Sequence, residues 1–151
     1  MTANWKNRKV LVTGAGGFIG SRLCEKLVEA GASVSAFVRY TSRSNPGLLR
    51  FIPKQVFNEI AFIRGDLRDF NAVEQSVDGV DTVFHLGALI SIPYSYVHPV
   101  ETVQTNVLGT MNVLEACRKH GAKLVHTSTS EVYGTALRVP IDENHPLQGQ
   151  S

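Results

Sequence analysis

The chain has 151 residues, of which 43% are hydrophobic and 19% charged, with a formal net charge of +2. This composition is typical of a globular domain with a real core, and the basic residues form no dense run of the kind that marks nucleic-acid binding. No apolar stretch approaches the length of a bilayer span, and the polar N-terminus around Trp5 is no signal peptide. We therefore expect a cytoplasmic protein with neither a nucleic-acid nor a membrane partner.

Apolar runs that predict strands alternate along the chain with patterns that predict helices. Short, mostly unbroken apolar runs, typical of strands buried on both faces, predict strands at 9–13, 34–38, 60–63, 81–86 and 123–127. Apolar spacings of three and four residues predict helices at 18–30, 70–77 and 99–120. This alternation indicates an α/β fold, a doubly wound parallel sheet of the Rossmann type.

Two further expectations concern less regular stretches. In the helix at 99–120 we expect five apolar side chains to face inward: Val103, Val107, Val113, Leu114 and Cys117. The stretch 40–58 is expected to be irregular, because it contains Pro46, Gly47 and Pro53. Cys24 and Cys117 lie inside helical patterns without metal-type spacing, so free thiols and no metal site are expected.

A glycine-rich turn connects the first strand directly to the first helix. Gly14, Gly17 and Gly20 have the spacing G-x-x-G-x-x-G, and Phe18 and Ile19 open the helix between the last two glycines. Such a turn lets the backbone approach a pyrophosphate closely, while the helix N-terminus offers N–H groups and a positive dipole end to the anion. These five residues are therefore candidate ligands of a dinucleotide.

Arg39 occupies the end of the second strand, where a carboxylate would indicate NAD. A guanidinium there can grip the 2′-phosphate of NADP, and Thr41, Ser42 and Arg43 follow closely. The cofactor is expected to be NADP or NAD, with NADP favoured. The alternative is that Arg39 is a solvent-facing loop residue.

Five motifs, in the order of the chain, resemble those of the extended short-chain dehydrogenases. They span 13–20, 65–69, 85–88, 106–110 and 127–134. The resemblance implies that Asp66 and Leu67 flank the adenine and that Asn106 braces the active site. It also implies that the cofactor is lined by Leu86, Gly87, Ala88 and Thr127. Without the resemblance, Asp66 reads as a cap or turn residue and Asn106 as a helix polar group with a local partner.

Within that superfamily, the stretches 89–96 and 139–150 look most like sugar-nucleotide 4,6-dehydratases of nonulosonic (legionaminic-type) acid pathways, relatives of the GDP-mannose 4,6-dehydratases. The resemblance implies a nucleotide-sugar substrate, a GDP- or UDP-linked N-acetylhexosamine. Ser91, Tyr94 and Asn106 would lie at its binding site.

The same resemblance implies a catalytic group at Thr129, Ser130 and Glu131. Oxidation of the sugar at C4 acidifies the C5 proton; Glu131 would remove that proton, water would leave from C6, and the hydride would return to C6. Thr129 would orient the C4 oxygen. Ser130 stands where dTDP-glucose dehydratases carry an acidic aspartate, so Glu131 or a water would have to protonate the leaving hydroxyl.

The Tyr-x-x-x-Lys pair of the family does not occur between Met1 and Ser151. We therefore expect residues 1–151 to be the N-terminal part of an NAD(P)-binding domain, with an incomplete sheet, no substrate lobe and no activity alone. A homodimer through the helix at 99–120 is expected for the parent protein. Alternatives are a UDP-glucuronate decarboxylase, a C4 epimerase of nucleotide sugars, or a non-catalytic NADP-binding sensor.

Overall fold

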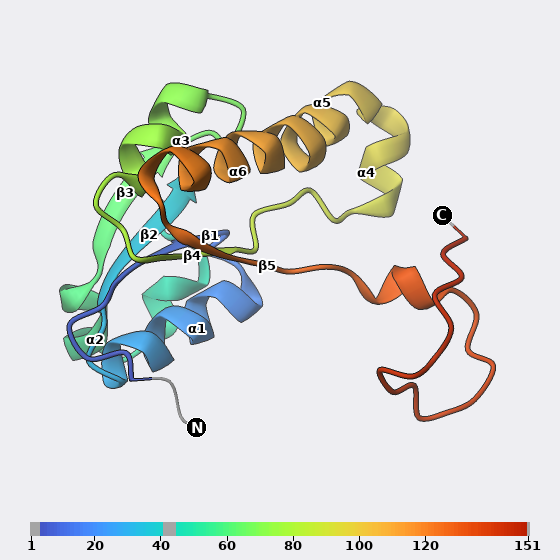
Figure 1. Cartoon of the computed structure of the whole chain (residues 1–151), viewed down its shortest axis with the longest axis horizontal. Helices are drawn as coiled ribbons and strands as arrows, with labels where there is room; N and C mark the ends of the chain where they lie inside the picture. Colours follow the sequence, from blue (N-terminus) through green and yellow to red (C-terminus); the bar gives the residue numbers. More distant parts are fainter. Residues whose placement is uncertain (1–3, 41–44, 151) are drawn as a thin grey trace.

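The computed structural model describes residues 4–40 and 45–150, and its centre is a five-stranded parallel sheet (Figure 1). The strand order is β3-β2-β1-β4-β5. The bounds are β1 Lys9–Thr13, β2 Ser33–Arg39, β3 Ala61–Gly65, β4 Thr82–His85 and β5 Lys123–His126. All five strands predicted from the sequence are confirmed, and the doubly wound Rossmann topology follows from their order.

Helices cover both faces of this sheet (Figure 1). One face carries α1 Phe18–Glu29, the 3-10 helix η1 Gly47–Phe51 and α2 Lys54–Glu59; the other carries α3 Phe70–Val77 and α6 Gly109–His120. Before α6 lie α4 Ile92–Val97, α5 Pro99–Val103 and a π-helical stretch, η2 Gln104–Leu108; after β5 lies the 3-10 helix η3 Ser130–Tyr133. No helix in the described ranges has the length and apolarity needed to cross a membrane.

The apolar strands divide their side chains between two cores. Val10 and Val12 of β1 pack toward α1, whereas Leu11 between them packs toward α3 and α6, and all three are at most 1% exposed. Successive residues of a strand point to opposite faces, so a strand covered on both sides must be apolar throughout. This is why β1 has no polar–apolar alternation.

The predicted inward face of the helix at 99–120 is partly wrong. Val113 and Cys117 are buried as predicted, but Val103, Val107 and Leu114 are 54%, 53% and 51% exposed. At about 100° per residue these three form a separate stripe, roughly a quarter-turn from the stripe that contains Val113. Spacings of three and four residues describe both stripes, so periodicity alone did not separate them.

The expectation of an irregular stretch at 40–58 is also corrected, because η1 and most of α2 lie within it. Pro46 and Pro53 are the N-cap residues of these two helices, and Pro93 occupies the first turn of α4. Proline is tolerated at a helix start, where its missing N–H has no intrahelical partner. The prolines therefore mark helix beginnings here and not their absence.

Candidate functional site

The glycine-rich turn brings β1, α1 and the β4 loop into backbone contact. Gly14 has φ +67°, and a Cβ there would lie 2.7 Å from the carbonyl carbon of Leu86. A Cβ on Gly20 would lie 2.3 Å from the carbonyl oxygen of Gly14. The first glycine is needed for its positive φ and the last for close packing of helix on turn.

Gly17 leaves the start of α1 open. It is the exposed N-cap residue of this 12-residue helix, its N–H donates to the Gly14 oxygen at 3.0 Å, and a Cβ on it would meet only that oxygen, at 3.2 Å. Phe18 and Ile19 follow it and are 84% and 64% exposed. A pyrophosphate can therefore approach the helix N-terminus without displacing side chains, so the turn fits the group that its sequence predicts.

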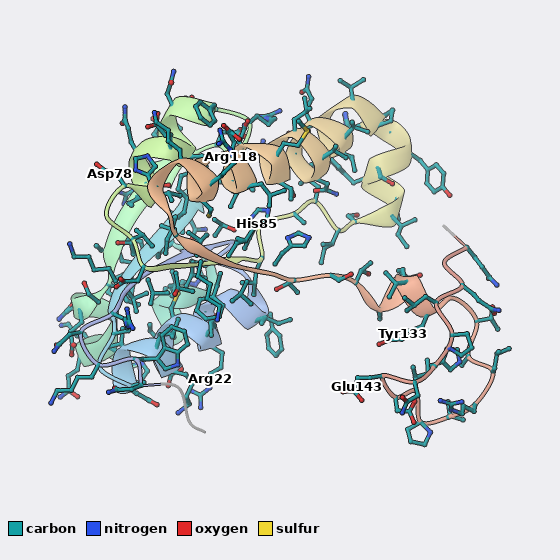
Figure 2. All side chains as sticks on the ribbon, viewed as in Figure 1. Arg22, Asp78, His85, Arg118, Tyr133 and Glu143 are labelled. Carbon is teal, nitrogen blue, oxygen red and sulfur yellow. The ribbon has the colours of Figure 1, made fainter. Side chains whose placement is uncertain are left out.

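A directed hydrogen-bond chain links this turn to β4 and to the long helix. The Gly87 N–H donates to Thr13 Oγ1 at 3.1 Å, and Thr13 Oγ1 lies 2.6 Å from His85 Nδ1. On the other side of the ring, His85 Nε2 lies 3.1 Å from Thr110 Oγ1, whose hydroxyl donates to the Asn106 carbonyl at 2.6 Å. Figure 2 shows His85 between the sheet and α6.

These partners determine the protonation of His85. Because Thr110 donates to a carbonyl, it must accept from Nε2–H; because Thr13 accepts an N–H, its own proton goes to Nδ1. His85 is 2% exposed, and its ring stacks on that of His126 with a centroid distance of 5.4 Å. Burial, and then the nearby His126, lower the pKa of His85 to about 4. The hydrogen-bond chain through His85 thus requires a neutral imidazole.

Asn106 and Leu67 hold the loops that border the turn. Both polar atoms of the Asn106 side chain pair with the backbone of Leu89, at 2.8 and 2.9 Å. Leu67 is buried against Gly87 and Gly109, where an added Cβ would lie 2.8 and 2.9 Å from its side chain. Asn106 fixes the chain just after Leu86, Gly87 and Ala88, and Leu67 lies two residues beyond the last residue of β3.

Arg39 and Asp66, both predicted on the adenosine side, are each paired with a neighbouring charged side chain. Arg39 Nη2 lies 2.9 Å from Glu101 Oε1, and the Tyr94 hydroxyl donates to Glu101 Oε2 at 2.5 Å. Asp66 accepts from Arg68 Nε and Nη2 at 2.9 and 2.6 Å, and these bonds, above all other effects, lower the pKa of Asp66. Thr41, Ser42 and Arg43 lie outside the described residues.

The predicted catalytic residues follow β5 on a segment that extends away from the sheet, so the structure does not bring them against the glycine-rich turn (Figure 1). The Thr127 N–H donates to the His85 carbonyl at 3.1 Å, which ties the start of this stretch to β4. Thr129, Ser130 and Glu131 are exposed, and Thr129 Oγ1 caps η3 by accepting the Glu131 N–H at 3.2 Å. Figure 2 shows Tyr133 and Glu143 on the segment that extends away from the sheet.

Ser91, predicted near a substrate, is the exposed N-cap residue of α4. Within 4–40 and 45–150, no group of three or more His, Cys, Asp or Glu side chains is placed to hold a metal ion. A surface hollow lined by Trp5, Arg8, Asp81 and Lys123 lies at the opposite, amino-terminal edge of the sheet, remote from every candidate residue.

The sequence did not predict three features of the candidate site: the hydrogen-bond chain Thr13–His85–Thr110, the position of Glu101, and the contact of η1 with the glycine-rich turn. Gly47 has φ +67°, a Cβ there would lie 2.3 Å from the Gly16 oxygen, and Leu48 N–H donates to that oxygen at 2.9 Å. These links join residues 25 to 72 positions apart, so local spacing carries little sign of them. The threonine before the glycine motif and the histidine ending β4 were the available clues.

A parallel sheet with a glycine-rich turn at the carboxyl end of β1 defines a dinucleotide-binding Rossmann domain. The chain belongs to the GDP-mannose 4,6 dehydratase family, whose family model matches residues 11–151.

Three curated relatives of this chain have different activities. It is 44% identical over 142 residues to a 2-alkyl-3-oxoalkanoate reductase of Stenotrophomonas maltophilia (strain K279a), covering 93% of this chain and 37% of that protein. It is 36% identical over 141 residues to UDP-glucuronic acid decarboxylase 1 of Arabidopsis thaliana, covering 93% and 30%. It is 36% identical over 143 residues to dTDP-glucose 4,6-dehydratase of Streptomyces antibioticus, covering 91% and 42%.

Solved structures of similar fold include two epimerases. UDP-glucose-4-epimerase from Stenotrophomonas maltophila, with bound NAD and formylated UDP-arabinopyranose, has a TM-score of 0.82 at 26% identity, covering 96% of this chain and 44% of that one. UDP-glucose 4-epimerase from Bifidobacterium longum, in complex with NAD+ and UDP, has a TM-score of 0.78 at 29% identity, covering 93% and 43%. This chain thus spans less than half the length of these relatives.

Proposed function

We propose that the protein is an NAD(P)-dependent sugar-nucleotide 4,6-dehydratase. The observation that carries the proposal is the order of the chain: Thr129, Ser130 and Glu131 follow β5, whose carboxyl end lies at the same edge of the sheet as the glycine-rich turn. Ligands of open α/β sheets bind at this edge. Membership in the GDP-mannose 4,6 dehydratase family supports the same reaction class.

When bound, the nicotinamide supplies a reversible hydride acceptor. The turn around Gly17 would hold the pyrophosphate through N–H groups of α1, and the backbone of Leu86 to Ala88 would border the cofactor. Glu131 would remove the C5 proton of a 4-keto sugar, and Thr129 would hydrogen-bond the C4 oxygen. Glu131 is exposed, so no other part of the described chain covers its carboxylate.

Several other activities share the initial oxidation or its reverse. The 36% identical decarboxylase and the epimerase structures keep UDP-glucuronate decarboxylation and C4 epimerisation as alternatives. The 44% identical reductase favours a second candidate, reduction of a 3-oxo acid with no elimination step. A non-catalytic sensor would bind the dinucleotide and turn over nothing.

The test is incubation of the full-length protein with GDP- and UDP-linked hexoses and N-acetylhexosamines in D2O. A dehydratase gives a 4-keto-6-deoxy product with deuterium at C5. Glu131→Gln is expected to lower turnover by about 10²- to 10⁴-fold while cofactor affinity is kept. Glu143→Gln, an exposed acid of the same segment, is the matched control and should retain activity.

Other products would replace the proposal with a named alternative. Carbon dioxide from UDP-glucuronate identifies a decarboxylase, and inversion at C4 without C5 exchange identifies an epimerase. NAD(P)H oxidation with 3-oxo acids alone identifies a reductase. Full C5 exchange in Glu131→Gln would remove this carboxylate from its role.

We also propose that the protein forms a homodimer through the exposed apolar stripe of α5, η2 and α6. Five side chains of this stripe, each at least 51% exposed, lie at spacings of three and four residues: Val100, Val103, Val107, Met111 and Leu114. A stripe of this spacing suits an isologous helix–helix contact. Val107→Glu should convert a dimer into a monomer in light scattering, whereas Leu137→Glu, on the exposed carboxyl-terminal segment, should not.

A further inference from the structure

Four charged side chains from three parts of the chain meet at the carboxyl ends of β2 and β3. Arg39 ends β2, Asp66 and Arg68 follow β3, and Glu101 lies on α5. Glu101 Oε1 lies 2.9 Å from Arg39 Nη2 and 3.6 Å from Arg68 Nη1. The Glu101 side chain is only 22% exposed, whereas that of Arg39 is 60% exposed. A carboxylate therefore occupies the inner side of the Arg39 guanidinium.

The cluster is balanced in charge. Asp66 takes Nε and Nη2 of Arg68 in a bidentate pair, and Glu101 contacts Arg39. Two arginines thus face two carboxylates, and the four side chains together carry no net positive charge. A phosphate would have to compete with Glu101 for the guanidinium and would approach a carboxylate of like charge.

Tyr94 also holds Glu101 in place. The second oxygen of Glu101, Oε2, accepts from the Tyr94 hydroxyl at 2.5 Å. This hydrogen bond, together with the pairing to Arg39, lowers the pKa of Glu101, and the same hydrogen bond raises the pKa of Tyr94. The carboxylate is consequently ionised at neutral pH and positioned from both sides, so it is a fixed charge and not a freely moving surface side chain.

In a Rossmann domain, the end of β2 faces the adenosine ribose of the dinucleotide. The two cofactors differ there by one 2′-phosphate, which carries a charge of about −1.5 to −2 at neutral pH. We propose that Glu101 is a specificity residue that occupies Arg39 and thereby makes the site select NAD over NADP. This inference rests on the proposed dinucleotide binding and names a selectivity opposite to the one that Arg39 alone predicts.

Substitutions of Glu101 and Arg39 distinguish this proposal from the alternative, in which Arg39 binds the 2′-phosphate of NADP. Affinities of the full-length protein for NADH and NADPH are measured by nicotinamide fluorescence. Wild-type protein should bind NADH more tightly. Glu101→Gln should strengthen NADPH binding by about tenfold or more, because Arg39 is freed for a charge-assisted bond, and should change NADH binding by less than about threefold.

Arg39→Gln completes a double-mutant cycle. In the wild-type background it should change NADPH affinity little, because Glu101 already engages the guanidinium; in the Glu101→Gln background it should abolish the gain. Glu115→Gln, which removes an exposed carboxylate paired to Arg118 on α6, is the matched control and should change neither affinity. Thermal unfolding monitored by circular dichroism verifies that each variant is folded.

Two results overturn the inference while leaving dinucleotide binding intact. One is a wild-type preference for NADPH that Arg39→Gln removes; the other is an unchanged NADPH-to-NADH ratio in Glu101→Gln. Loss of binding to both cofactors in wild-type protein would instead contradict the proposed function itself. If Glu101→Gln does not fold, Tyr94→Phe, which releases one side of the carboxylate, should shift the ratio in the same direction by a smaller factor.

Discussion

The sheet with its helices and the segment after β5 differ in how they are held. Residues 9–127 form two buried cores, and their candidate groups are joined across β1, β4 and α6 by hydrogen bonds. In 128–150, every described hydrogen bond and ion pair runs within the segment itself. The cofactor half of the site is therefore fixed by packing, whereas the position of Glu131 depends on the direction in which β5 leaves the sheet.

The largest effect is expected at the glycine-rich turn, on the packed side of this comparison. Gly14→Ala should lower the free energy of unfolding by about 2–5 kcal/mol. A positive φ costs a non-glycine residue about 1–2 kcal/mol, and the 2.7 Å approach to the Leu86 backbone adds an overpacking cost of about 1–3 kcal/mol. Urea unfolding measures the change, and dinucleotide affinity should fall with it.

Gly79→Ala is the control for this prediction. Gly79 has φ +69°, nearly that of Gly14, but no atom lies within 4 Å of an added Cβ. Its cost should be only the conformational part, about 1–2 kcal/mol. Equal losses in both variants would mean that the contact between the turn and Leu86 contributes nothing.

A second prediction concerns His85, which joins the two layers of the packed region. Its folded-state pKa of about 4 lies below the ordinary value of 6.5, so the unfolded chain binds the proton first as pH falls. The stability contributed by the neutral ring is complete above pH 6.5 and is lost between pH 6.5 and 4. The total loss is on the order of 3 kcal/mol.

Unfolding free energies measured at several pH values between 7 and 4 test this. In His85→Gln the amide does not titrate, so this part of the pH dependence should disappear while other groups keep theirs. Identical slopes in the two proteins would show that His85 is not the group responsible.

The sequence predicted a helix or strand well where the pattern that defines it lies within that same stretch of the chain. The strand predicted at 9–13 and the helix predicted at 70–77 have the same bounds in the structure, because an apolar run and a simple amphipathic spacing define each of them. The five strands also imply which loops share the carboxyl edge. The glycine-rich turn could therefore be predicted both in place and in shape.

Features that depend on distant residues were not predictable in this way. The outward stripe of Val103 and Val107 has the same periodicity as a buried one, and only the sheet's position distinguishes them. Glu101 was not singled out, since its partner Arg39 lies 62 residues earlier. The roles of Thr129 and Glu131 remain predictions, because they depend on where a ligand sits and not on the chain's local pattern.

The smallest global effect is expected from the segment after β5. Among the described residues of this segment, only His145 is buried, with 3% exposed. Its ring accepts the Leu137 N–H at 3.0 Å. The ring also meets that of Tyr133 edge-on, with 5.8 Å between the ring centroids. His145→Ala should loosen the segment and speed hydrogen exchange at Leu137, yet lower the global unfolding free energy by less than about 0.5 kcal/mol. Leu11→Ala, at a fully buried core position, should cost about 2–5 kcal/mol. If His145→Ala matched that loss, the segment would unfold together with the sheet, and Glu131 would be held by the same packing that holds the glycine-rich turn.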